Sequence, residues 1–130
     1  MDPDAYTAVL GLERYVQDGV LPSGLVHLVK IRASELNGCA FCLDMHHREA
    51  RADGETQRRL DVMSAWREVP SLFTDRERAA LALTDAVWGE ASRVFDEVEL
   101  VALLMAIATI NVWNRLAVST HQELPAIEAS

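Results

Sequence analysis

The residues best suited to chemistry lie in one short stretch, ELNGCAFCLDMHH, at positions 35–47. It holds both cysteines of the chain, Cys39 and Cys42, and two of its four histidines, His46 and His47. Residues three or four apart share a face of a helix, so a helical stretch would align Cys39, Cys42 and His46, with His47 facing elsewhere. The spacing therefore predicts a site made of two thiols and one imidazole.

Two thiols and an imidazole at this spacing are suited to redox chemistry. Sulfur atoms one helical turn apart close a disulfide with little movement of the backbone. The positive end of the helix dipole favours a thiolate at Cys39, and His46 is placed to take the proton of Cys42. A thiolate attacks a peroxide oxygen and becomes a sulfenic acid, while the peroxide is reduced to an alcohol; a second thiol then condenses with the sulfenic acid to form a disulfide and water. The stretch indicates a dithiol peroxidase or a disulfide reductase. Which sulfur attacks stays open, although His46 is nearer along the helix to Cys42.

Two other interpretations of these residues remain. Cys39 and Cys42 with two of His27, His46 and His47 would supply a Cys2His2 zinc site. One continuous helix is poorly suited to that role, because structural zinc sites usually take their ligand pairs from separate elements. Alternatively, the cysteines are small core residues of an oligomeric binding protein whose site is idle. No bound cofactor is predicted.

The composition limits the partners and the compartment. The chain has 130 residues, 50% of them hydrophobic, which suits one domain with a packed core. Its 12 basic and 20 acidic residues give a formal charge of −8, which disfavours binding to nucleic acid or to an anionic membrane. The first residues, MDPDAYTAVL, show no basic leader, and no apolar run approaches the roughly 20 residues that span a bilayer. We expect a soluble, cytoplasmic protein with reduced thiols.

Helices must position the site, because apolar residues recur at helical spacing along almost the whole chain. Asn37 and Gly38 form a good helix terminator, and Thr74 with Glu77 predicts a capping box. The sequence predicts a single all-α domain over 1–130, a bundle of about six helices. These cover residues 3–17, about 22–36, about 39–53, a shorter helix through 60–66, 75–90 and 96–119.

The predicted last helix differs from the others in its apolar residues. Asp96 and Glu99 repeat the start signal of a capping box. Beyond them, the helix is apolar nearly all round through its middle. Such a helix is central in a core or is shared with another subunit, since a monomer surface would leave one apolar face in water.

Three blocks of the sequence together resemble a known family. They are LVHLVKIRASELNGCAFCLDMHHREA, LFTDRERAALALTDAV and ELVALLMAIATINVWNRLAV, and they lie in this order within about 20–118. These blocks resemble the carboxymuconolactone decarboxylase superfamily, in its AhpD-like alkylhydroperoxidase branch. The most specific elements are NGCAFCLDMH and ATINVWNRLA. The resemblance implies an all-helical fold that assembles into homotrimers or homohexamers.

The same resemblance implies a thiol-dependent hydroperoxide reductase with an antioxidant role. By position, it makes Cys42 the residue that attacks peroxide, Cys39 the resolving residue and His46 the base of the proton relay. It also implies re-reduction by a dithiol donor of the dihydrolipoyl type. The decarboxylases that give the superfamily its name lack the cysteine pair, so their activity is the less expected one.

One position departs from the family pattern. Twelve residues before Cys39, where the alkylhydroperoxidases carry a glutamate of the proton relay, this chain has His27. An imidazole there would shuttle a proton near its unperturbed pKa of about 6.5, but it would not stabilise an imidazolium on His46 as a carboxylate would. We therefore expect His27 to face the pocket, and the activity to be weaker, to differ in pH dependence or to use another substrate.

Overall fold

The computed structural model describes residues 2–126 of the chain. These residues contain seven α-helices and two 3-10 helices. No strand occurs within these residues, so the predicted all-α class is confirmed. The 3-10 helices, Met63–Glu68 and Pro70–Leu72, connect α4 to α5. The α-helices are α1 (Pro3–Gln17), α2 (Ser23–Asn37), α3 (Ala40–Ala52), α4 (Gln57–Val62), α5 (Asp75–Thr84), α6 (Trp88–Val94) and α7 (Glu97–Ser119).

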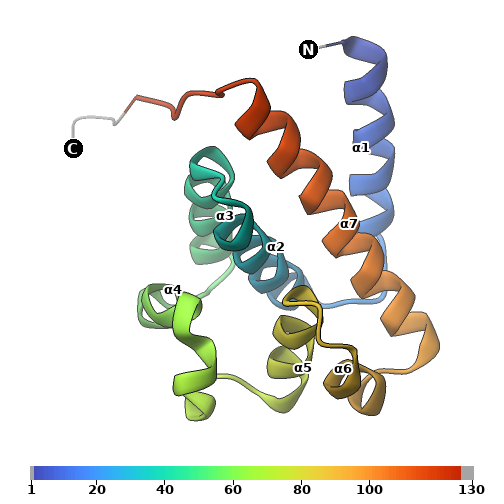
Figure 1. Ribbon diagram of the computed structural model, residues 1–130, viewed down its shortest axis with the longest axis vertical. Coiled ribbons are helices and arrows are strands. Elements are labelled where there is room, and N and C mark those ends of the chain that lie inside the picture. The colour runs from blue at the N-terminus through green and yellow to red at the C-terminus, as the bar shows by residue number, and fades with distance from the viewer. Residues whose placement is uncertain (1, 127–130) are drawn as a thin grey trace.

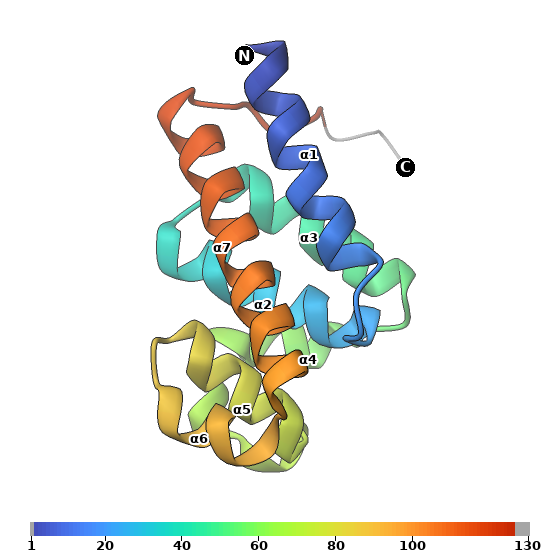
Figure 2. The ribbon, with the colours of Figure 1, turned by 90° about the vertical axis from the view of Figure 1, so that its right-hand side faces the viewer.

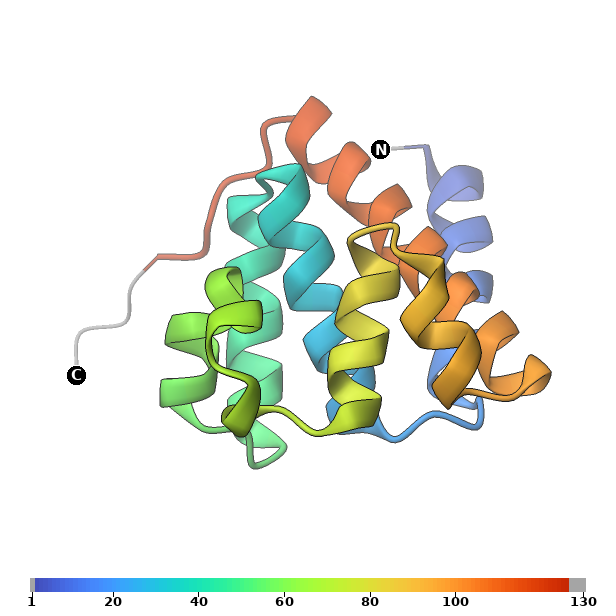
Figure 3. The ribbon, with the colours of Figure 1, turned by 60° about the horizontal axis from the view of Figure 1, so that its bottom comes forward.

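Helix α2 is the centre of the bundle. It packs against α7, α3 and α5, and Figure 3 shows it between α3 and α5. Leu28, Val29 and Ile31 of α2 are completely buried, and each such side chain contributes about 1.5–3 kcal/mol through its removal from water. Helices α4, α5 and α6 gather at one end of the molecule (Figures 1 and 2), while α1 packs along α7. The junction of α2 and α3, which carries the thiols, is therefore at the opposite end from α4 to α6.

Local signals near the site set the helix ends as the sequence predicts. Gly38 ends α2 in the left-handed conformation, with φ of 64°, which a residue without Cβ adopts at little cost. Cys39 is the N-cap of α3, so the turn between the two helices is only two residues long. Because the turn is so short, the two helices are held side by side.

Both predicted capping boxes are present. The hydroxyl of Thr74 accepts from the backbone N–H of Glu77, whose carboxylate accepts in return from the N–H of Thr74. Asp96 and Glu99 make the same reciprocal pair at the start of α7. Each box satisfies two backbone donors that a helix start leaves free.

The predicted helix over 75–90 is wrong, because it is broken between α5 and α6. Ala86 has a positive φ of 69°, which an α-helix does not tolerate. Next to it, the carboxylate of Asp85 accepts from the guanidinium of Arg32 at 2.7 Å and from the indole N–H of Trp66 at 3.2 Å. These contacts to distant residues hold the chain in a turn, and nothing in the apolar spacing of 75–90 indicates it.

Helix α7 has a buried face and an exposed apolar face. By length and composition α7 could span a membrane, whereas the sequence analysis expected no apolar run of that length. A core helix of a soluble protein meets the same criterion, and α7 packs against α1, α2 and α3. Only 33% of its most apolar window is buried. Val98, Val101 and Leu104 are 63%, 46% and 43% exposed. One copy of the chain therefore leaves this apolar face uncovered.

Candidate active site

Cys39 lies at the N-terminus of α3, one position earlier than the first helical turn. Its Sγ accepts a hydrogen bond from the backbone N–H of Cys42 at 3.3 Å, which is the N-cap interaction of the helix. Both cysteines are free thiols and each is 1% exposed. The pair is therefore reduced, adjacent and shielded from bulk solvent.

Burial sets the acidity of Cys42, the thiol that the sequence predicts to attack peroxide. Burial, and next the neighbouring Cys39, raise the pKa of the Cys42 thiol to about 12. The side chain of Asn114 acts in the opposite direction, by stabilising the thiolate. Cys42 thus holds its proton at neutral pH, and chemistry at its sulfur requires a base that removes this proton.

His46 has the properties of such a base. Its side chain is 4% exposed, and its Nδ1 lies 3.2 Å from Oε2 of Glu49. Because an ionised carboxylate only accepts, Nδ1 carries the proton and Nε2 keeps its lone pair. Nε2 is buried and has no hydrogen-bond partner among the described residues. Burial, and next the charge of Lys30, lower the pKa of His46, so the imidazole is neutral at neutral pH.

Cys42 and His46 line the same cavity, which has a volume of about 330 Å³. Its wall comes from α1, α2, α3 and α7, so it exists only once these four helices have packed. Aromatic and apolar side chains supply much of the wall: Tyr6, Phe41, Met45, Trp113, Leu116 and Ala117. The thiol of Cys42 and the imidazole of His46 therefore line one mostly apolar cavity.

Glu13 and Lys30 form a buried ion pair in the wall of this cavity. Their side chains are 14% and 6% exposed. The indole N–H of Trp113 donates to Oε2 of Glu13 at 3.2 Å, and the ring of Trp113 packs edge-on against Tyr6. These contacts hold α1 against α2 and α7 at the cavity.

Asn114 joins the thiol region to the centre of the fold. It is completely buried, its amide donates to Oγ of Ser34 at 3.0 Å, and its carbonyl oxygen accepts from the amide of Asn37 at 2.9 Å. The amide of Asn37 also donates to Asn111 at 2.6 Å. This network pins α7 against α2 directly behind Cys42.

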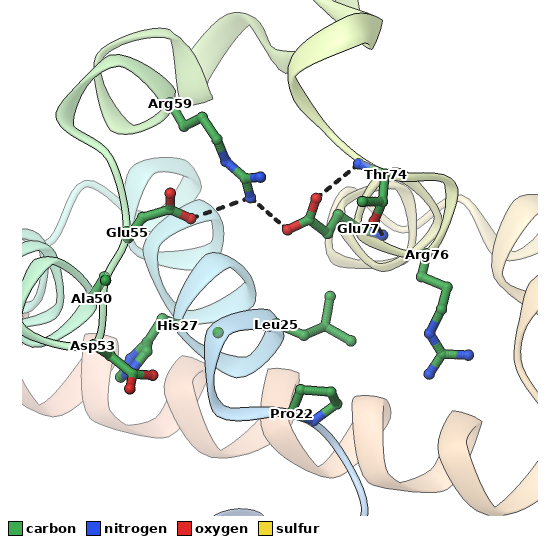
Figure 4. A pocket seen from close by; sticks show the side chains of 12 residues that line it. Pro22, Leu25, His27, Ala50, Asp53, Glu55, Arg59, Thr74, Arg76 and Glu77 are labelled. Atoms are coloured by element: carbon green, nitrogen blue, oxygen red, sulfur yellow. Dashed lines mark hydrogen bonds and ion pairs between the residues drawn. The ribbon is translucent and has the colours of Figure 1, made fainter.

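His27 is the predicted site residue that the structure places elsewhere. It lines a second cavity, of about 420 Å³, formed by the N-termini of α2 and α5 and the ends of α3 and α4 (Figure 4). Its Nε2 lies 3.3 Å from Oδ2 of Asp53. The expectation that His27 faces the thiol pocket is therefore wrong, because His27 lies one turn nearer the start of α2 than Lys30 and meets Asp53 at the end of α3, whereas Lys30 lines the cavity of Cys42 and His46.

The zinc interpretation loses its ligand set for the same reason. Among residues 2–126, no group of three or more His, Cys, Asp or Glu side chains is placed to hold a metal ion. His27, which would have to come across from α2, lies in the other cavity. The site brings together Cys39, Cys42 and His46, and leaves His27 out.

Glu13, Gln17 and Tyr6 are cavity residues that sequence reasoning did not find. They come from α1, which lies outside the cysteine block. The side chains of Glu13 and Trp113 are 100 residues apart in the chain. One weak signal was available, since Glu13 interrupts the apolar face of an otherwise amphipathic helix.

Comparison with known proteins places the chain in a family. Residues 3–86 match the family model described as "Carboxymuconolactone decarboxylase family". The chain belongs to this family. The uncharacterised protein YdfG of Bacillus subtilis is 33% identical over 129 residues, and the match covers 90% of this chain and 87% of YdfG. The family expected from the sequence blocks is thus confirmed.

Solved structures share the fold. A protein of unknown function from Agrobacterium tumefaciens, proposed to be the antioxidant defence protein AhpD, is similar with a TM-score of 0.88 and 41% identity, covering 97% of this chain and 94% of that one. The debrominase Bmp8 in its apo form is similar with a TM-score of 0.84, over 96% of this chain and 73% of that one. At 19% identity, the second likeness concerns the fold alone. The AhpD-like helical fold is therefore shown.

Proposed function

We propose that this protein is a thiol-dependent hydroperoxide reductase in which Cys42 attacks the peroxide, Cys39 resolves the product and His46 is the base. The observation that carries the proposal is that Cys42 and His46 line one cavity, with Cys39 against the backbone of Cys42. The likeness to the Agrobacterium protein proposed to be AhpD supports the same activity.

The first step uses the free nitrogen of His46. Nε2 accepts the proton of the Cys42 thiol, and the sulfur attacks the terminal oxygen of the hydroperoxide ROOH. The O–O bond breaks, and the leaving alkoxide takes the proton from His46 to become ROH. Cys42 is then a sulfenic acid, and two electrons have passed from sulfur to oxygen.

The second step uses Cys39. Its sulfur attacks the sulfur of Cys42, the S–O bond breaks, and hydroxide leaves with the Cys39 proton as water. In total, two thiols and ROOH give a disulfide, ROH and water. An external dithiol, proposed to be of the dihydrolipoyl type, restores the thiols by two successive exchanges.

The cavity supports an organic hydroperoxide as substrate. Its volume of about 330 Å³ exceeds what hydrogen peroxide needs, and Tyr6, Phe41 and Trp113 offer apolar contact to an alkyl or aryl group. The polar end of such a molecule would meet Cys42 and His46. We therefore propose that apolar hydroperoxides are preferred.

The exposed face of α7 supports a homo-oligomer as the working form. Val98, Val101 and Leu104 leave an apolar stripe that a second copy would remove from water. We propose a homotrimer or homohexamer, and a cytoplasmic location in which the thiols stay reduced.

Peroxide treatment of the purified protein tests the proposal. One equivalent of cumene hydroperoxide should convert the thiols of Cys39 and Cys42 to a disulfide, detected by mass spectrometry, and dihydrolipoamide should restore them. Cys42→Ser should abolish peroxide consumption, while Cys39→Ser should stop at a sulfenic acid that dimedone traps. A matched control, His121→Ala, alters an exposed histidine outside the cavity. Two free thiols that persist in folded protein after peroxide would disprove the proposal.

A further inference from the structure

Helix α1 brings a carboxylate to the thiol cavity that the proposed reaction does not yet use. Glu13 lies on α1, and its Oε1 is paired with Nζ of Lys30 on α2. Its other oxygen, Oε2, accepts from the indole N–H of Trp113 on α7 at 3.2 Å. Both oxygens of Glu13 are therefore held, each by a different helix, and the carboxylate has a fixed position.

Lys30 is the reason that this carboxylate matters. A lysine that is 5% exposed is uncommon, because a buried ammonium without a partner is strongly destabilised. The ammonium lines the same cavity as His46, close enough for its charge to oppose protonation of the imidazole. Without a partner, the charge of Lys30 would destabilise the positively charged imidazolium that His46 becomes when it takes the Cys42 proton.

The charged groups around His46 are few. Glu49 lies beside it on α3, Lys30 faces it from α2 and Glu13 faces it from α1. The cavity residues of α7, Trp113, Leu116 and Ala117, carry no charge. Glu49 is 49% exposed, so solvent screens its charge, whereas Glu13 is 14% exposed and acts through protein. Glu49 raises the pKa of His46 more than Glu13 does, but Glu13 is the carboxylate that also pairs with the buried Lys30.

We propose that Glu13 is a positioning residue, whose carboxylate neutralises Lys30 at the cavity wall so that His46 accepts the proton of Cys42. The inference rests on the proposed function, because it assigns Glu13 a part in that proton transfer. It also gives α1 a role in the reaction, since Glu13 lies on α1 and lines the cavity of Cys42 and His46.

Titration of His46 by NMR in the resting protein tests the charge balance without turnover. Glu13→Gln should move the His46 midpoint to lower pH, and Lys30→Met should move it to higher pH. The double variant should return it close to the wild-type value, because both charges are gone. Asp4→Asn, which removes an exposed carboxylate from the same helix, is the matched control and should leave the midpoint unchanged.

Turnover of cumene hydroperoxide supplies the second readout. Glu13→Gln should lower kcat about threefold with little change in KM, since about threefold corresponds to half a pKa unit of proton affinity. The double variant should recover most of that loss, which a merely structural role for Glu13 would not allow. Circular dichroism verifies that each variant is folded.

The outcomes separate this inference from the proposed function. A His46 midpoint that Glu13→Gln leaves in place, or that Asp4→Asn moves equally, overturns the role of Glu13 even if the wild-type protein reduces peroxide. If Glu13→Gln does not fold, a Lys30→Met midpoint that stays in place or falls overturns it. A wild-type protein that never reduces peroxide overturns the proposed function and, with it, the catalytic part of the inference.

Discussion

The Nδ1 atom of His46 lies 3.2 Å from Oε2 of Glu49, one turn further along α3. This contact sets the tautomer of the imidazole and leaves Nε2 free to accept a proton. Glu49 also raises the pKa of His46, against the larger effects of burial and of Lys30, which lower it. The imidazole of His46, which we propose as the base, is thus oriented by a neighbour from its own helix.

Replacing Glu49 should weaken the base without destroying it. Glu49→Gln removes the negative charge, so we expect the pKa of His46 to fall further and peroxide turnover near pH 7 to drop by about threefold, a small effect because the carboxylate is half exposed. The measurement is kcat as a function of pH. Asp44→Asn, on the same helix but paired with Arg48 away from the cavity, is the control. Equal effects from the two variants would contradict the role of Glu49.

Stability at alkaline pH should report the buried thiol. The pKa of Cys42 is raised to about 12 from an ordinary 9.0, chiefly by burial, so the folded protein keeps this proton over a range in which the unfolded chain loses it. The unfolding free energy should therefore decrease as pH rises above about 9. Cys42→Ala lacks this dependence, so the advantage of wild type over the variant should shrink between about pH 8 and about pH 10 in urea unfolding. If the stability advantage of wild type over Cys42→Ala instead grows with pH, the pKa of Cys42 is lowered in the folded protein and the prediction is wrong.

Loss of the buried amide of Asn114 should destabilise the fold. Asn114→Ala removes the partner of Ser34 and of Asn37 and leaves a small cavity, so we expect a loss of about 2–4 kcal/mol in the free energy of unfolding. It should also raise the pKa of Cys42 further, because Asn114 stabilises the thiolate. Urea unfolding and the pH dependence of Cys42 alkylation measure the two effects. Asn111→Ala, at a half-buried position of the same network, should cost less.

His27 should be dispensable for peroxide chemistry. Because its side chain lies against Asp53 in the other cavity, His27→Gln should leave the rate of Cys42 oxidation unchanged. Stability should change by no more than about 1 kcal/mol, since the pair with Asp53 is partly exposed. Stopped-flow oxidation by cumene hydroperoxide measures the rate. A tenfold slower reaction in a folded variant would restore His27 to the proton relay.

The apolar face of α7 should hold copies of the chain together. Val101→Asp places a charge in the middle of this face, and we expect it to lower the mass measured by light scattering toward that of one chain. Leu36→Asp, at an exposed leucine near the C-terminal end of α2, is the matched control and should leave the mass unchanged. If wild type already has the mass of one chain, the proposed oligomer is wrong.

The sequence by itself determined most of the helices and the order of the reactive groups at the start of α3. Cys42 and His46 share a face because residues four apart do so in any helix, and Cys39 caps the start of the same helix. Gly38 and the capping boxes at Thr74 and Asp96 mark helix ends by contacts within a few residues. All of these features depend on local spacing, which the sequence displays directly.

Only the tertiary structure decided what surrounds those groups. Glu13 and Trp113 meet across 100 residues, Asp85 ends α5 through Arg32 and Trp66, and His27 turns away from the thiols. The raised pKa of Cys42 likewise comes from burial by helices outside its own segment. These features depend on the angles and distances at which whole helices pack, and periodicity within one segment carries no information about either.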